Sequence, residues 1–333
     1  MNPLIFLFQL YLPICTAVII GAGISYFLGL PLFKRRFKRQ LNRDIPTYLG
    51  KFLFLIGVPL SIVNFLHRAD LSGSVLMAPL VAWSAILLAL LCSRLWVRPY
   101  RRAWPQPSQG SFSLSSMFGN TGYIGFPVVL LLPQLGPDYF GWALFYDVLG
   151  TLLGAYVLGV ILAAQFGTKT PGRDDQSRPP NRQRLTALTE VVKNPTILAF
   201  FTGLALRPVV FPELLDIVLN GFAWLMVMLA LALMGMRLQQ LTSWGNLKPA
   251  SIAVGIKMFL IPLVVGMTLT AIGIEGPARL VMVLQSGMPC AFATLVLSET
   301  YHLDRDLAVT SVGLSSVVLL LMLPLWLWGF CTW

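Results

Sequence analysis

Charged residues are scarce in this chain. Lys, Arg, Asp and Glu together make up 11% of its 333 residues, whereas hydrophobic residues make up 56%, and the mean hydropathy is +0.76. An average soluble domain carries about 25% charged residues. The shortage of charge excludes an ordinary soluble domain and indicates a polytopic membrane protein.

Cysteine and histidine are also scarce. The cysteines are scattered through apolar segments without ligand-like spacing, at Cys15, Cys92, Cys290 and Cys331. Neither a disulfide framework nor a metal site is therefore expected. The two histidines, His67 and His302, stand alone near predicted helix ends. Because no nucleophile, histidine and acid can be grouped, we expect no catalytic residues, no enzyme activity and no resident cofactor.

Long apolar runs dominate what is present. A hydrocarbon core of about 30 Å needs roughly 20 apolar residues per helix, and about ten such runs fit between the polar breaks. The amino terminus lacks a basic region and is too long for a signal-peptide core, so we interpret it as a retained first span. The predicted spans are 4–32, 46–66, 73–97, 111–133, 138–166, 193–211, 214–238, 248–273, 277–300 and 305–331.

Basic residues predict the orientation of these spans. The net charge is +11, but Lys and Arg lie in short connections between spans, which argues against nucleic-acid binding. They concentrate in the odd-numbered connections, such as 34–43, 94–102 and 169–184. Because positive loops stay in the cytoplasm, we expect an integral protein of the cell membrane with both termini extracytoplasmic.

Two of the predicted spans are interrupted by polar residues, glycine and proline. Such residues free backbone groups at a depth where lipid cannot bond to them, so protein or a water-filled cavity must surround them. Pro127 and Pro289 each suit the first position of a new half-helix. For either span alone, a simple proline kink is the alternative. The candidate solute-binding residues are Asn120, Thr121, Gly122, Tyr123, Gly125 and Pro127 in the fourth span, and Gln285, Ser286, Gly287 and Pro289 in the ninth.

The longest polar stretch divides the chain into halves. Residues 167–192 form the predicted cytoplasmic linker between a five-span repeat at 1–166 and a second at 193–333. Five is an odd number, so the halves must have opposite orientations. Secondary transporters often bind their substrates between such inverted repeats, at discontinuous helices.

The interruptions suggest the chemistry of the solute. The amino ends of two half-helices would present free N–H groups and partial positive charge, which suits an anion such as a carboxylate. The neutral side chains of Asn120, Thr121, Gln285 and Ser286 would orient it. The carboxyl ends of the preceding half-helices could instead hold Na⁺, and the sequence does not decide between the two.

Two ionisable residues lie deep in predicted spans. Asp147 and Lys257 each stand nine residues from a charged residue at a span end, Asp138 and Lys248 respectively. At about 1.5 Å per residue they reach similar depths. Charges at such depth are costly. They are predicted either to form a static ion pair that fixes packing, or to exchange ions or protons that drive transport.

The motifs resemble a known family. The stretches GNTGYIGFPVVL, KNPTILAFFTGLAL and SGMPCAFATLVLSETYHLD resemble recurrent segments of the auxin efflux carriers, which include the plant PIN exporters and bacterial organic-anion permeases. This resemblance implies ten helices in two inverted repeats, a fold shared with bile acid/sodium symporters. Helices 4 and 9 would cross at their breaks, and Asn120, Pro127 and Pro289 are the site positions that carry over.

The same resemblance implies a division of labour. Helices 3–5 and 8–10 would form a mobile transport unit, and helices 1, 2, 6 and 7 a scaffold. This sequence departs from the family in two respects. Its central loop is short, which favours a compact prokaryotic type over a phosphorylation-controlled plant exporter, and no asparagine follows the second break.

We therefore expect a secondary transporter that moves a small organic anion across the lipid bilayer by an elevator-type mechanism. One alternative is a cation/proton exchanger that uses Asp147 and Lys257, with coupling to H⁺ or Na⁺. Another is a membrane receptor that binds a ligand without moving it. Substrate, direction and oligomeric state, including a homodimer, are left open by the sequence.

Overall fold

The computed structural model describes residues 3–29, 35–71, 74–167, 193–240 and 245–330. Within these ranges the chain is helical and has no strand beyond one isolated backbone bridge. The helices long and apolar enough to cross a membrane are Asp44–Arg68, Met77–Tyr100, Phe140–Phe166, Glu213–Gln239, Leu247–Ala271 and Arg305–Phe330. The predicted all-α polytopic membrane protein is therefore confirmed, whereas the count of ten spans and the inverted repeats stay predictions. The predicted linker lies outside the described residues, apart from Gly167.

The described chain divides into two compact units. Unit 1 takes 1–71, 122–144 and 195–242, and unit 2 takes 72–121, 145–194 and 243–333, in each case as far as residues are described. The helices of unit 1 are α1 (Pro3–Gly29), α2 (Arg35–Phe52), η1 (Leu53–Gly57), α3 (Val58–Arg68), α6 (Phe126–Leu131), α10 (Pro195–Leu206) and α11 (Glu213–Gln239). Two elements run from one unit into the other, η3 (Thr121–Gly125) and α7 (Phe140–Tyr146).

Unit 2 contains several helices that are continued by short π-helical or 3₁₀ segments. Its elements are α4 (Met77–Val97), η2 (Arg98–Tyr100), α5 (Gln106–Met117), η4 (Asp147–Leu152), η5 (Ala155–Gly159), α8 (Val160–Phe166), α12 (Leu247–Gly255), η6 (Ile256–Leu260), α13 (Ile261–Ala271), α14 (Gly276–Ser286), α15 (Ala293–Thr300) and α16 (Arg305–Phe330). The π-helical segments are η4, η5 and η6 here, with η1 and η3 elsewhere in the chain. π-helical turns are frequent at functional sites.

Some helix ends differ from the predicted span ends. The predicted second span, 46–66, lies within the candidate membrane span Asp44–Arg68. The helix α2 continues outward from it to Arg35, so most of the first basic connection is helical, which fits the good helix propensity of Lys and Arg. The sixth span was expected to reach residue 211, but α10 ends at Leu206. Pro208 follows closely, and the residue before a proline disfavours helical backbone angles.

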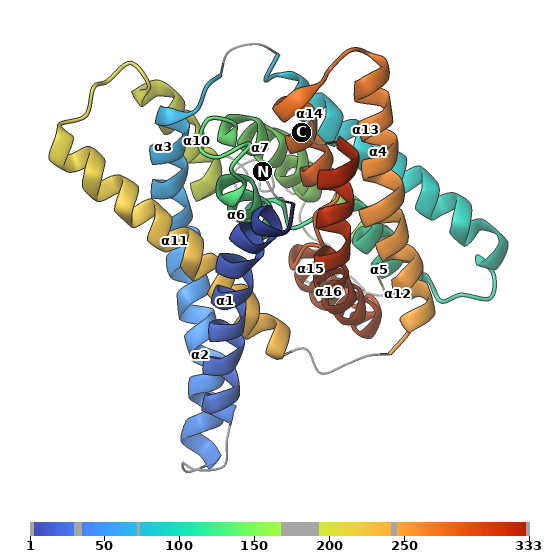
Figure 1. Ribbon diagram of the computed structural model, residues 1–333. Helices are drawn as coiled ribbons and strands as arrows, with labels where there is room; N and C mark the ends of the chain where they lie inside the picture. The colour runs from blue at the N-terminus through green and yellow to red at the C-terminus, as the bar shows by residue number, and fades with distance from the viewer. Residues whose placement is uncertain (1–2, 30–34, 72–73, 168–192, 241–244, 331–333) are drawn as a thin grey trace. The chain divides into compact units, whose positions relative to one another are not determined.

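Unit 1 is built on a close contact between α1 and α11, which pack along each other (Figure 1). A Cβ atom added to Gly235 of α11 would lie 2.9 Å from the backbone nitrogen of Ala22, and one added to Gly21 would lie 2.8 Å from the Cα atom of Ala232. Only glycine allows two helix backbones to approach this closely. Beside this contact, an apolar cluster joins Leu53 to α11.

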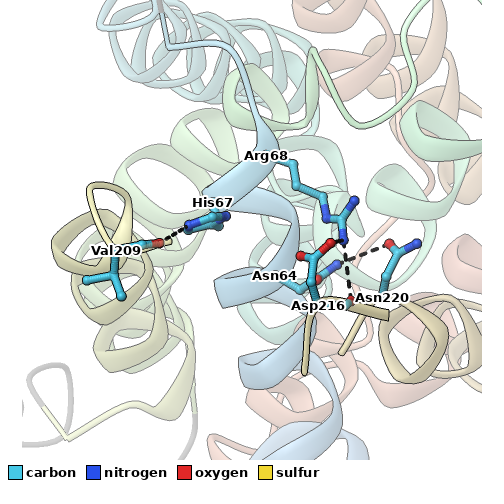
Figure 2. A network of polar contacts seen from close by, with 6 residues as sticks. All are labelled: Asn64, His67, Arg68, Val209, Asp216 and Asn220. Carbon is cyan, nitrogen blue, oxygen red and sulfur yellow. Dashed lines mark hydrogen bonds and ion pairs between the residues drawn. The ribbon is translucent and has the colours of Figure 1, made fainter. Parts of the chain in front are cut away.

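A polar network fixes the end of α3 to the α10–α11 hairpin (Figure 2). The Arg68 guanidinium lies 2.7 Å from the Asp216 carboxylate, and a ring nitrogen of His67 lies 2.8 Å from the carbonyl oxygen of Val209. The Asn64 amide also donates to the Asn220 side chain at 3.4 Å. Because the side chains of Arg68 and Asp216 are about one-third exposed, at 32% and 39%, the ion pair adds little stability and mainly sets position.

Unit 2 packs around α5, whose residues 108–117 are all buried. Two of the serine hydroxyl groups on this helix bond to a residue outside it. Ser108 donates to the Asp304 carboxylate at 2.7 Å, and Ser111 donates to the Asp304 carbonyl at 2.7 Å. The other oxygen of that carboxylate accepts the N–H of Leu307, which caps the start of α16. One acidic residue thus joins α5 to α16.

Candidate functional site

The first interruption comprises residues 118–120, between the end of α5 and the start of η3. The N–H of Phe118 closes the last turn of α5 on the Leu114 carbonyl, at 3.1 Å, and the Phe118 backbone is extended. Asn120 and Thr121 are only 6% and 2% exposed. The chain therefore leaves the helix inside the protein, before the glycine and proline residues that follow.

The second interruption comprises residues 287–292, between α14 and α15. The N–H of Gly287 closes α14 on the carbonyl groups of Val283 and Leu284, at 3.1 and 3.0 Å. Gln285 and Ser286, the last residues of α14, have no exposed surface. Both interruptions thus follow a buried helix end in unit 2.

The two interruptions bond to each other through their backbones. The N–H of Asn120 donates to the Pro289 carbonyl at 2.7 Å, and the N–H of Ala291 donates to the Phe118 carbonyl at 2.9 Å. Gly119 and Cys290 lie opposite each other in this antiparallel bridge. Backbone groups that leave a helix at membrane depth need partners within the protein, and here each interruption supplies them to the other.

Lys257 lies beside both interruptions. Its side chain, 4% exposed, donates from Nζ to the Ser286 carbonyl at 2.7 Å. A Cβ atom on Gly119 would lie 2.9 Å from Lys257 Cε, so the glycine makes room for the lysine stem. The ammonium therefore lies at the carboxyl end of α14, where the helix dipole favours a positive charge.

Asp147 lies at the opposite kind of helix end. Its buried carboxylate accepts a hydrogen bond from the Thr121 hydroxyl. Thr121 begins the helical stretch Thr121–Leu131, and an amino end favours negative charge. The two buried ionisable residues also share a local geometry, because Asp147 begins η4 and Lys257 lies in η6.

Asp147 and Lys257 do not form an ion pair in this structure. The salt bridges between side chains of the described residues are Arg68–Asp216 and Arg305–Glu299. The predicted static pair is therefore not what the structure contains. Equal depth along two helices does not fix how far apart the helices stand or which way each side chain faces, and each residue has its own partner instead.

Buried polar atoms without a protein partner accompany the interruptions. In the described part of the chain they include the Oγ atom of Ser115 and both polar atoms of the Gln285 amide. Ser115 precedes the first interruption and Gln285 the second. A buried polar group without a partner costs about 1–3 kcal/mol, so these atoms are suited to bonding water or a polar solute.

The remaining predicted site residues belong to unit 1. Gly122, Tyr123, Gly125 and Pro127 fall in the segment 122–144. Tyr123 packs against the apolar cluster that contains Leu53. It also lines a cavity of about 390 Å³, together with Lys51 and Arg237 among others.

Of the two prolines predicted to begin half-helices, Pro127 lies within the first turn of α6, whereas Pro289 does not lie at a helix start. Pro127 is the second residue of α6, and helical structure has already resumed at Thr121. Pro289 lies within the second interruption, four residues before α15 begins. Its carbonyl, rather than its missing N–H, forms the bond that joins the interruptions.

The sequence prediction missed three residues that hold this geometry. Gly119 leaves space for the Lys257 side chain. A Cβ atom added to Gly119 would also lie 3.0 Å from the Met288 carbonyl oxygen. The Cys290 backbone N–H donates to the Ser315 hydroxyl at 3.0 Å. The glycine beside Asn120 was a usable signal, whereas nothing in the sequence relates Ser315 to Cys290. Among the described residues, no three His, Cys, Asp or Glu side chains gather as metal ligands.

Comparisons with known proteins identify the family of this chain. The model of the family described as "Membrane transport protein" matches residues 26–327. An uncharacterized transporter of Methanocaldococcus jannaschii is 30% identical over 225 residues, which cover 66% of this chain and 68% of that protein. An uncharacterized transporter of Methanothermobacter thermautotrophicus is 25% identical over 289 residues, which cover 86% and 89%. The chain therefore belongs to the membrane transport protein family, as its resemblance to the auxin efflux carriers predicts.

Proposed function

We propose that this membrane transporter moves a small organic anion, such as a carboxylate, that binds beside the paired interruptions. The observation that carries the proposal is the buried Lys257 ammonium next to residues 118–120 and 287–292. A cation in a site of low polarity attracts a carboxylate strongly. Its bond to a carbonyl group, rather than to a carboxylate of the protein, leaves its charge available to the solute.

The neighbouring polar groups give this anion its orientation. The Gln285 amide can donate through its nitrogen, and this atom has no partner among the described residues. Thr121 begins the return to helix after the first interruption, and N–H groups at the start of a helix favour an anion. Neutral donors orient a carboxylate without a permanent ion pair, so the solute can leave again.

We propose an elevator-type movement of unit 2. That unit contains both interruptions together with Asp147 and Lys257, so a solute held there would travel with it. In this proposal unit 1, which also contains residues 122–144 of the fourth and fifth spans, would serve as the scaffold that was expected from helices 1, 2, 6 and 7. The same proposal includes four further expectations: inverted five-helix repeats, a crossing of helices 4 and 9, a location in the cell membrane, and extracytoplasmic termini.

The test begins with a thermal-shift screen of the purified protein against mono- and dicarboxylates. A carboxylate that raises the melting temperature is then tested for tracer exchange in sealed proteoliposomes. We expect Asn120→Ala and Gln285→Ala to lose most of this exchange. Ser251→Ala is the matched control, because Ser251 is exposed on α12 and bonds only to its own helix. Exchange at the wild-type rate in both site variants would overturn the proposal.

The second candidate function is a cation/proton exchanger that uses Asp147. The observation in its favour is the buried carboxylate bonded to Thr121. It predicts that proteoliposomes without organic solute collapse a pH gradient when Na⁺ or K⁺ is added, and that Asp147→Asn abolishes this. A gradient that persists until a carboxylate is supplied would exclude it. Binding of a carboxylate without any tracer movement would instead favour a receptor.

A further inference from the structure

A basic cavity lies in unit 2, at the end of α4 that the sequence assigns to the cytoplasm. Its volume is about 540 Å³. The arginines that line it are Arg94, Arg98 and Arg101, and they are joined by polar side chains from α5 and α8 that include Gln109, Ser113 and Gln165. No acidic residue lines the cavity in the described part of the chain. The arginines therefore give the cavity a positive charge that no acidic side chain of its lining balances.

The turn that carries these arginines is firmly held. The Gln109 side-chain amide donates to the carbonyl groups of Arg101 and Trp104, at 3.0 and 2.6 Å. The rings of Trp96 and Phe112 stack 4.8 Å apart, and Trp104 packs edge-on against both, with ring centroids 5.6 and 5.4 Å away. The guanidinium groups thus extend from a backbone fixed by hydrogen bonds and aromatic packing.

Positive charge near the cytoplasm is expected from topology alone. Topology does not, however, require that the arginines surround a cavity or that they lack acidic partners. The side-chain ion pairs among the described residues involve Arg68 and Arg305, and none involves the three arginines of the cavity. Three guanidinium groups around one concave space match the oxygens of a phosphate group, which they can bond in a bidentate manner.

An exposed apolar stripe leads along α4 to this cavity. Its leucines lie on one helix face at intervals of seven, four and four residues and are 51–61% exposed, namely Leu80, Leu87, Leu91 and Leu95. From Leu80 to Leu95 the stripe is about 22 Å long at 1.5 Å per residue, whereas one leaflet of the hydrocarbon core is about 15 Å thick. Leu95 itself lines the cavity. An acyl chain can therefore follow the stripe while its headgroup reaches the arginines.

We propose that the cavity lined by Arg94, Arg98 and Arg101 binds the phosphate headgroup of an anionic phospholipid, with an acyl chain along the leucine stripe of α4. Basic pockets between membrane helices on the cytoplasmic side bind acidic headgroups in this way. The site is separate from the interruptions and does not depend on the organic-anion proposal. It makes the composition of the membrane a determinant of the stability of unit 2.

The test uses purified full-length protein in neutral detergent. Phosphatidylglycerol, phosphatidylcholine or inorganic phosphate is titrated in, while retained lipid is counted by native mass spectrometry and the melting temperature is recorded. We expect phosphatidylglycerol to bind and to raise the melting temperature. Arg98→Gln and Arg101→Gln should each weaken its apparent affinity at least fivefold. Arg102→Gln is the matched control, because it removes the same charge from the same turn but Arg102 does not line the cavity.

Three results would overturn the proposal. Equal weakening by Arg102→Gln would mean general attraction to a basic surface. Equal binding of phosphatidylcholine would mean that the arginines do not select the headgroup. Inorganic phosphate that binds in an Arg98-dependent manner, as tightly as phosphatidylglycerol, would assign the cavity to a soluble phosphate compound instead.

Discussion

The two interruptions in unit 2 end comparable buried helices but are compensated by opposite charges. After α5, helical structure resumes at Thr121, whose hydroxyl donates a hydrogen bond to the Asp147 carboxylate. After α14, the final carbonyl, that of Ser286, accepts the Lys257 ammonium. In each case the charged side chain comes from another part of the sequence.

The difference shows which end of a helix each charge serves. Asp147 lies at an amino end and Lys257 at a carboxyl end, which are the positions that the helix dipole favours for their charges. A buried charge is costly without such compensation. The structure therefore places the two charges at two different helix ends, and the Lys257 ammonium also lies beside Gly119 in the first interruption.

Removing the positive charge should have the largest effect. We expect Lys257→Met to lower carboxylate exchange in proteoliposomes at least tenfold, because the solute loses its counter-charge and the Ser286 carbonyl loses its donor. Lys248→Met is the matched control, since Lys248 is exposed near the start of the same helix. Equal exchange in the two variants would mean that Lys257 only caps α14.

Removing the hydroxyl of Thr121 tests how much its hydrogen bond stabilises the buried Asp147 carboxylate. We expect Thr121→Val to lower the free energy of unfolding by about 1.5–3 kcal/mol, the usual worth of a hydrogen bond to a charged group. Thr121→Ser keeps the hydroxyl and should stay near the wild type. The measurement is denaturant unfolding in detergent micelles, and a loss shared by both variants would point to the methyl group instead.

Filling the space beside Lys257 should have a somewhat smaller effect. In Gly119→Ala the new Cβ would lie 2.9 Å from Lys257 Cε and 3.0 Å from the Met288 carbonyl oxygen, so we expect a loss of about 1–2 kcal/mol from overpacking. The control is Gly255→Ala, because nothing lies within 4 Å of a Cβ at that position. It should be neutral or stabilising by up to about 1 kcal/mol. Similar stability of the two variants would contradict the close contact.

Breaking an exposed ion pair should have the smallest effect. Arg305 and Glu299 are 57% and 56% exposed and lie 2.7 Å apart, and such pairs contribute about 0.2–1 kcal/mol. Arg305→Gln should therefore shift unfolding within that range and leave exchange unchanged. A loss as large as that of Thr121→Val would show that partnership, rather than burial, decides the value of a charge here.

The sequence predicted much of the fold because hydropathy and membrane thickness constrain it. Long apolar runs correctly indicated the helices around Met77–Tyr100 and Arg305–Phe330. It failed at Arg35, because polar residues were assigned to a connection although Lys and Arg favour helix. The π-helical turns at Asp147 and Lys257 could not be predicted, since one extra residue per turn leaves no pattern in composition.

The candidate site was only partly predictable for a related reason. Polar residues within an apolar run located the interruptions near Asn120 and Gly287. The exact break at 118–120 depends on the Pro289 carbonyl, which lies about 170 residues further along the chain, and sequence spacing carries no such information. The sequence likewise left open whether Asp147 and Lys257 pair, because depth along a helix gives one coordinate where three are needed.

The glycine contact between α1 and α11 has a mechanical consequence. Where two backbones touch, as at Gly21 and Gly235, there is no layer of side chains that can change rotamer and let one helix slide past the other. We therefore expect α1 and α11 to resist sliding along each other. The elevator-type movement that we propose for unit 2 needs a second unit that keeps its shape, and the close backbone contact at Gly21 and Gly235 gives unit 1 this rigidity.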